Sequence, residues 1–226
     1  MCTNYVPNGH DIFLEKFYGV KVPNVEFTPE TFPGYDAPVI RNIDRKIDEA
    51  QLGRECIAAR FGLVPYWAKP EDVAKPRLKF ATHNARAETV GNLASFKHAW
   101  KNAQFCLIPA VAFYEPCWET GKAVRWKIWL ADSEPFALAG IWETWRRDDL
   151  VVESFSMLTV NADDHPLMRR MHRPDDEKRM PVVLHRDDVD AWLLAPPEEA
   201  QRMCQQYPAE LMLAKADPLA PRKRAA

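Results

Sequence analysis

Four segments between residues 105 and 160 are rich in β-branched and aromatic residues, a composition typical of β-strands. Short turns separate the segments and carry Gly121, Asp132 with Ser133, and Asp148 with Asp149. The segments are FCLIPAVAFYE (105–115), VRWKIWLA (124–131), PFALAGIWE (135–143) and LVVESFSMLTV (150–160). Because connections this short join antiparallel neighbours, we predict an antiparallel meander at the centre of the fold.

Shorter elements and loops surround this group of strands. They comprise strands within 53–67 and over 180–184, helices over 11–18, 94–102, 186–194 and 197–207, and loops over 21–40 and 70–80. The sequence holds no internal repeat and no linker rich in glycine or serine. We therefore predict a single α+β domain over residues 1–215, built around a mostly antiparallel β-sheet with peripheral helices, and a flexible basic tail over 216–226.

Composition excludes several classes of protein. The net charge of −2 gives no overall attraction to nucleic acid, so any nucleic-acid site must be a local basic patch. No apolar run approaches the ~18 residues of a membrane span, and the polar first residues do not resemble a signal peptide. The five cysteines form no CxxC pair, which argues against a zinc site or a disulfide framework. We expect a monomeric cytoplasmic protein with no metal, no cofactor and no membrane partner.

The second residue is a cysteine, an unusual place for a reactive side chain. A chain terminus frays and an exposed thiol is open to oxidation, so packing alone does not explain Cys2. Once Met1 is removed, Cys2 carries a free α-amine beside its thiol. Two nucleophiles on one residue make Cys2 the first candidate for chemistry.

Four further segments place a polar or titratable residue at the edge of an apolar stretch: HNARAET (83–89), AFYEP (112–116), LTVNADDHPLMRRMH (158–172) and KRMPVVL (178–184). Glu115 ends a very apolar strand, so partial desolvation should raise its pKa and suit it to proton transfer; a solvated carboxylate is the alternative. His172 is either a catalyst or a surface histidine, and Asn84 taken alone is a turn residue. Arg86 and Glu88 could form a weak local ion pair.

A cysteine at position 2, the segment NARAET, the strand end F-Y-E and a histidine upstream of RMPVVL occur in this order. In this arrangement the chain, over residues 2–194, resembles the SOS response-associated peptidase (SRAP) family. The resemblance implies a single α+β domain around antiparallel β-structure, with a positively charged DNA channel. It also implies covalent capture of abasic sites in single-stranded DNA during the DNA damage response, with association with the nucleoid when DNA is bound.

The resemblance assigns roles to five residues. Cys2 matches the family's cross-linking cysteine. Asn84 matches the asparagine of the N-A-R-x-E-T motif at the reacting centre, and Arg86 in the same motif matches a phosphate-contacting arginine. Glu115 matches the catalytic glutamate, and His172 matches the active-site histidine before R-M-P.

The resemblance also assigns residues to a DNA-binding face. Pro65 and Trp67 match the family's W-G-x-x-P-x-W loop, whose tryptophan wedges against bases, and Pro38 resembles the proline of its N-x-A-P turn. Trp118 could replace the tryptophan expected directly after the glutamate, where this chain has Pro116. Weaker candidates for phosphate contacts are Lys75, Arg77 and Lys79.

The chain departs from the family pattern in two further places. Thr3 and Asn4 replace the Gly and Arg of the usual M-C-G-R start, which removes a positive charge from the expected DNA-facing strand. The link from His172 to Arg179 is longer than usual and contains RPDDEK. These departures bear on DNA affinity and channel width, and they leave the reactive set intact.

The reaction that the resemblance implies needs these residue types. An abasic site exposes an aldehyde when its sugar ring opens, and an α-amine, with a pKa of about 7.7–8.0 against about 10.4 for lysine, attacks it to give a Schiff base. The thiol of Cys2 then adds to the imine carbon and closes a five-membered thiazolidine. Glu115 is expected to move protons, His172 to assist ring opening, and Asn84 to hold the amine and sugar oxygens.

Three other interpretations stay open at this point. An N-terminal-nucleophile amidohydrolase also exposes a cysteine after methionine removal, although the sequence lacks a recognisable glutamine-binding motif set. A Cys/His/Asn peptidase could use Cys2, His172 and Asn84, although the segment that begins a papain-type helix is missing. A DNA-binding module without a covalent step is the third. Autoproteolytic removal of Met1 and a lyase-type activity would accompany the main reaction.

Overall fold

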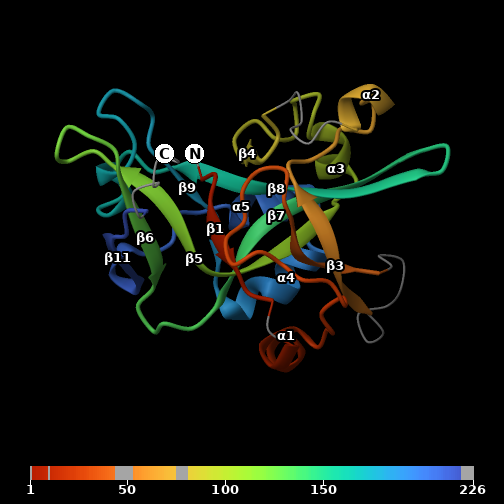
Figure 1. Cartoon of the computed structure of the whole chain (residues 1–226), viewed down its shortest axis with the longest axis horizontal. Coiled ribbons are helices and arrows are strands. Elements are labelled where there is room, and N and C mark those ends of the chain that lie inside the picture. The colour runs from red at the N-terminus through yellow and green to blue at the C-terminus, as the bar shows by residue number, and fades with distance from the viewer. Residues whose placement is uncertain (1, 10, 44–52, 75–80, 220–226) are drawn as a thin grey trace, which may run out of the picture.

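An eleven-stranded β-sheet forms the frame of the computed structural model, which describes residues 2–9, 11–43, 53–74 and 81–219 (Figure 1). Short helices lie around its periphery, which confirms the predicted α+β class. The strands are β1 (Tyr5–Pro7), β2 (Asp36–Asn42), β3 (Arg54–Phe61), β4 (Asn84–Arg86), β5 (Phe105–Cys117), β6 (Val124–Leu130), β7 (Phe136–Arg147), β8 (Leu150–Asn161), β9 (Arg179–Pro181), β10 (Val183–Leu184) and β11 (Met212–Ala216).

The helical segments are short, and most lie where the sequence predicts them. They are α1 (Asp11–Tyr18), α2 (Pro70–Val73), α3 (Lys97–Lys101), α4 (Val189–Leu194) and α5 (Pro197–Met203), with 3₁₀ segments at Met168–Arg170, Arg186–Asp188 and Ala209–Leu211. The predicted loop over 70–80 is wrong at its start, because α2 begins at Pro70, where a proline fits the first turn of a helix. No helix in the described part of the chain is long and apolar enough to span a membrane.

Strand β5 changes its neighbour along its length. Residues 105–110 pair antiparallel with β7, and residues 113–117 pair antiparallel with β6. β6 therefore does not continue into a ladder with β7, and the predicted meander is wrong at that step; the other edge of β6 pairs with β11. The physical reason is length, because a strand of 13 residues in a twisted sheet can present its two halves to different partners.

Several strands carry no strong sequence signal. β2 begins at Asp36 inside the predicted loop over 21–40, and the polar segment of β4 pairs parallel with β8. β3 also pairs parallel with β8, so the sheet is mixed although mostly antiparallel. β11 pairs with β6 as far as Ala216, so the predicted tail is wrong at its first residue. Residues 220–226 lie outside the described part of the chain.

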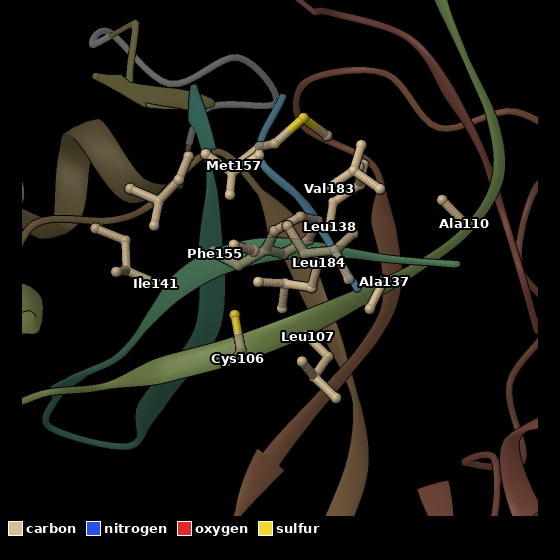
Figure 2. Packing of buried hydrophobic residues seen from close by; sticks show 14 of the residues in the cluster. Cys106, Leu107, Ala110, Ala137, Leu138, Ile141, Phe155, Met157, Val183 and Leu184 are labelled. Atoms are coloured by element: carbon tan, nitrogen blue, oxygen red, sulfur yellow. The ribbon is translucent and has the colours of Figure 1, made fainter. Parts of the chain in front are cut away.

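The core lies between β5, β7 and β8. Figure 2 shows Leu107 of β5, Leu138 of β7 and Phe155 of β8 within one cluster of buried apolar side chains. A Cβ added at Gly140 in β7 would lie 2.8 Å from Cδ1 of Ile108 and 2.9 Å from Sγ of Cys106, so a larger residue there would force these side chains to shift. This packing fixes the strand β5, whose far end carries Glu115.

Candidate active site and nucleic-acid face

The four residues predicted to carry the chemistry lie together, although they come from four separate segments. The Asn84 side-chain amide donates to the backbone carbonyl of Cys2, with an Nδ2–O distance of 2.7 Å. The Nε2 atom of His172 lies 3.4 Å from Oε2 of Glu115. Glu115 also lies close enough to Cys2 for its charge to raise the pKa of the Cys2 thiol. The structure therefore brings all four into one group.

Backbone pairing produces this convergence. β1 runs antiparallel to the end of β5, with Tyr5 opposite Phe113, and the Tyr114 amide donates to the carbonyl of Asn4 at 2.9 Å. This pairing sets the segment that precedes β1 beside Glu115. β4 brings Asn84 to the same place through its parallel pairing with β8. In Figure 1 the start of the described chain, β4 and β9 all lie in the upper middle of the view.

Glu115 is the most perturbed carboxyl group of the site. Burial raises its pKa from 4.5 to about 7. Its Oε1 atom is buried and has no hydrogen-bond partner among the described residues. The solvated carboxylate considered from the sequence is therefore wrong. Glu115 can gain or lose a proton near neutral pH and has an oxygen available to a reactant.

The thiol of Cys2 is held in its neutral form. Its residue is 1% exposed, and its Sγ atom lies 3.5 Å from the carbonyl oxygen of Asn4. Burial raises the pKa of Cys2, and the nearby charge of Glu115 raises it further. A buried thiol of this kind needs an adjacent base before it can act as a nucleophile. Glu115 is the group in position to be that base.

His172 packs against this pair with a strained backbone. Its φ of +63° lies in the left-handed region, and its amide donates to the carbonyl of Pro116 at 2.7 Å. The side chain is buried, so the surface histidine considered from the sequence is wrong. Burial lowers the pKa of His172 to about 4, and the imidazole is therefore neutral at pH 7.

In the side-chain amide of Asn84, the nitrogen is hydrogen-bonded to a described residue and the oxygen is not. Its Nδ2 atom donates to Cys2, as described above, and its buried Oδ1 atom has no hydrogen-bond partner within the described residues. It begins the strand β4, which corrects the interpretation as a simple turn residue. An unsatisfied buried acceptor is costly unless a ligand or water meets it, so Oδ1 is a candidate contact for a bound reactant.

The arginine and the tryptophans predicted for DNA contact are at least partly accessible. Arg86 is exposed and pairs with Glu177 at 2.7 Å, whereas Glu88 pairs with Arg179; the predicted local pair between Arg86 and Glu88 is wrong. Trp67 is 39% exposed, and its Nε1 atom donates to the carbonyl of Ala94. Trp118 is half-buried beneath the guanidinium of Arg173, which lies 5.2 Å from the ring centroid.

The two prolines assigned to this face are not accessible. Pro38 lies in the middle of β2, opposite Ala58, and is buried rather than part of a turn. Pro65 is also buried, and its carbonyl accepts from the amide of Ala68. Both are buried, so neither offers a surface to DNA. The weaker candidates Lys75, Arg77 and Lys79 lie outside the described residues.

Asn4, which stands where the resembled family usually has an arginine, forms contacts that the sequence did not indicate. Asn4 is buried, and its Oδ1 atom accepts from Arg125 of β6 at 2.8 Å. The Arg125 guanidinium lies 3.3 Å from the ring centroid of Tyr114 and pairs with Glu30 at 2.6 Å. The network ties the segment after Cys2 to the strand that carries Glu115. No local pattern around Arg125 could have identified this role.

Comparison with known proteins places the chain in a family. The sequence matches the family described as SOS response associated peptidase (SRAP) over residues 1–218. The chain belongs to the SRAP family. A crystal structure of a protein from Bordetella bronchiseptica superposes with a TM-score of 0.86 at 36% identity, covering 96% of this chain and all of that one.

Relatives of this SRAP protein carry names that refer to abasic sites. The abasic site processing protein YoqW of Bacillus subtilis is 30% identical over 198 residues, which span 83% of this chain and 80% of YoqW. The abasic site processing protein HMCES of Xenopus tropicalis is 23% identical over 83% of this chain and 57% of its own length. The animal relative is thus considerably longer than the matched region.

Proposed function

We propose that this SRAP protein captures abasic sites in single-stranded DNA through Cys2, once Met1 has been removed, and forms a stable thiazolidine linkage. The observation that carries the proposal is the placement of the buried Cys2 beside the end of β5, which carries Glu115, a buried carboxyl group whose pKa is raised to about 7. The names of the relatives supply the reactant class. The linkage would protect the site during the response to DNA damage.

The first half of the reaction is imine formation. The α-amine of Cys2 attacks the aldehyde carbon of the opened sugar, and the resulting carbinolamine loses its hydroxyl group as water. The leaving hydroxyl needs a proton, and the attacking amine must lose one. Glu115 is suited to both transfers because its pKa of about 7 leaves both protonation states populated near neutral pH.

The second half is ring closure by the thiol. The sulfur of Cys2 bonds to the imine carbon, and the thiol proton passes to the imine nitrogen, so no further atoms are gained or lost. Since burial disfavours a free thiolate at this position, the ionised carboxylate of Glu115 takes the proton as the sulfur attacks. The product resists hydrolysis because both nucleophiles of one residue hold the same carbon.

The remaining residues would position the reactant. Oδ1 of Asn84 is free to accept from the amine or a sugar hydroxyl, and the neutral imidazole of His172 can assist sugar opening. Arg86 would exchange Glu177 for a DNA phosphate. Trp67 and Trp118 offer ring surface to unstacked bases, which is why we propose a single strand.

The geometry does not favour a cysteine peptidase triad. In a triad the histidine contacts the nucleophile and the asparagine orients the histidine. Here His172 lies against Glu115, and Asn84 binds the backbone carbonyl of Cys2. Removal of Met1 by the same site, and strand cleavage from an unclosed Schiff base, are side activities of the proposed chemistry.

The test is incubation with a single-stranded oligonucleotide that carries one abasic site, followed by denaturing electrophoresis. The parent protein should give a slow, heat-stable band, and its intact mass should lack one methionine. Cys2→Ser keeps the amine, so it should give only a Schiff base that borohydride can trap. Cys204→Ser, a change at another buried cysteine, serves as the control and should cross-link like the parent. A stable band from Cys2→Ser would reject the proposal.

A further inference from the structure

Two exposed aromatic rings, those of Tyr66 and His98, contact each other next to Trp67. The rings of Tyr66 and His98 lie with their centroids 4.8 Å apart and their planes 37° from one another. Tyr66 is 44% exposed, and the side chain of His98 is 43% exposed. Each ring is therefore supported by the other while much of its surface stays open to solvent. We call Tyr66 and His98 the ring pair.

Polar contacts hold the ring pair in place. The Nδ1 atom of His98 lies 2.7 Å from Oε2 of Glu143, whose other oxygen accepts from Gln104 at 3.4 Å. The backbone carbonyl of Tyr66 accepts from the guanidinium of Arg147 at 3.1 Å. An exposed aromatic pair held by a buried carboxylate and an arginine is preorganised, so a ligand that stacks on it loses little entropy.

Cations flank the ring pair. Lys97 and Lys101 are exposed and lie one turn apart on α3, the helix that also carries His98. Arg147 is exposed and contacts Tyr66, as described above. Within the part of the chain that the structure describes, none of these three side chains forms an ion pair with a carboxylate. Exposed aromatic rings beside uncompensated cations are the features that recognise a single-stranded nucleic acid.

A short segment of the chain connects the candidate active site to the ring pair. Asn84 begins β4, and the segment from there leads directly to α3 and His98. Trp67, next to Tyr66, donates to the carbonyl of Ala94 in that same segment. In Figure 1 α3, β4 and the start of the described chain lie in the upper half of the view, whereas α1 lies at the bottom.

We propose that Tyr66 and His98 form a stacking platform for bases that flank the abasic nucleotide, with Lys97, Lys101 and Arg147 facing the phosphates. The occupant is the same DNA strand that the proposed function places at Cys2, so the inference rests on that function. It extends the nucleic-acid face past Trp67 to the outer side of α3. The platform would be sequence-tolerant, because every base has a face that can stack.

The experiment measures the affinity of the intact protein for an unmodified, fluorescently labelled single-stranded oligonucleotide. Tyr66→Ala and His98→Ala should each weaken binding by about fivefold or more, since one base–aromatic stack supports an effect of at least that size. Tyr66→Phe keeps the ring and should bind like the parent. Phe17→Ala is the matched control, because Phe17 is also exposed and stacked on a neighbouring ring, but on α1.

The outcomes separate this inference from the proposed function. If the parent cross-links to abasic DNA while both alanine variants bind plain DNA like Phe17→Ala, the platform is rejected and the proposed function stands. If the parent binds plain DNA through the ring pair but never cross-links, the platform stands and the covalent function fails. The thermal unfolding temperature of each variant should match that of the parent. If a weak-binding variant is also unfolded, the double variant Lys97→Ala with Lys101→Ala takes its place. This double variant should reduce the salt dependence of DNA binding. An unchanged salt dependence in that pair would also reject the platform.

Discussion

Two buried glutamates each lie beside a histidine, Glu115 with His172 and Glu143 with His98. In the first pair the nitrogen and oxygen are 3.4 Å apart, both side chains are buried, and Oε1 of Glu115 has no hydrogen-bond partner among the described residues. In the second pair the distance is 2.7 Å, and Gln104 meets the other carboxylate oxygen. The imidazole of His98 is also considerably more exposed than that of His172.

The contrast shows how the same two residue types come to serve different purposes. Both oxygens of Glu143 are occupied, so its carboxylate holds a neighbouring side chain in place. Glu115 is equally buried but incompletely hydrogen-bonded, so it keeps capacity for a reactant and has a pKa of about 7. Burial with unmet hydrogen-bonding capacity is the combination typical of a catalytic carboxyl group.

The largest effect should come from exchanging each glutamate for its amide. Glu115→Gln keeps the shape but cannot move a proton, so the single-turnover rate of cross-linking at saturating DNA should fall by roughly 10²–10⁴-fold. Glu143→Gln should alter only the concentration of DNA needed for saturation, through its contact with His98. Equal effects of the two changes on the saturated rate would remove the distinction between the pairs.

Stability against pH tests the same contrast without DNA. The folded pKa of Glu115 is raised above 4.5, so its contribution to stability is full below pH 4.5 and is lost as the pH rises through about 7. A rise from 4.5 to about 7 corresponds to about 3 kcal/mol. The stability of Glu115→Gln relative to the parent should therefore increase by about this amount between pH 4.5 and pH 8. Urea unfolding at both pH values measures the difference in free energy of unfolding between the variant and the parent. If this difference does not change with pH, the raised pKa of Glu115 is contradicted.

Replacing His172 should cause a different defect from replacing Glu115. His172→Ala should slow cross-linking less than Glu115→Gln does, because it removes assistance with sugar opening and leaves the main proton carrier in place. Release of the finished adduct should slow as well. Time courses in the forward direction and in exchange against competitor DNA measure both steps. A dead His172→Ala beside a normal Glu115→Gln would reverse the assignment.

The smallest effect concerns an exposed carboxylate, Glu177, which pairs with Arg86. Glu177→Gln should free Arg86 for a phosphate and tighten DNA binding by up to about fivefold, as expected for a surface ion pair. The slope of log affinity against log salt should become steeper by up to about 0.7. Glu119→Gln removes the same charge from an exposed pair with Arg170 and serves as the control. Identical gains in both variants would assign the effect to net charge alone.

The sequence by itself determined the strands β5 to β8 and the residues that are candidates for the chemistry. Strand-forming residues follow one another closely there, and each chemical candidate stands at the edge of an apolar stretch. Such signals are local, so they can be recognised in the sequence before the fold is known. The family resemblance, carried by Cys2, NARAET, F-Y-E and RMPVVL, is local in the same sense, and the match over residues 1–218 confirms it.

Only the tertiary structure decided how these residues meet. The parallel pairing of β4 with β8, the burial of Pro38 and the contact of Arg125 with Asn4 each join segments that are distant in sequence. The pKa of Glu115 depends on the same packing, because desolvation is set by everything that surrounds a group rather than by its neighbours along the chain. Burial is a property of the assembled fold, and it is burial that distinguishes Glu115 from an ordinary carboxylate at the end of a strand.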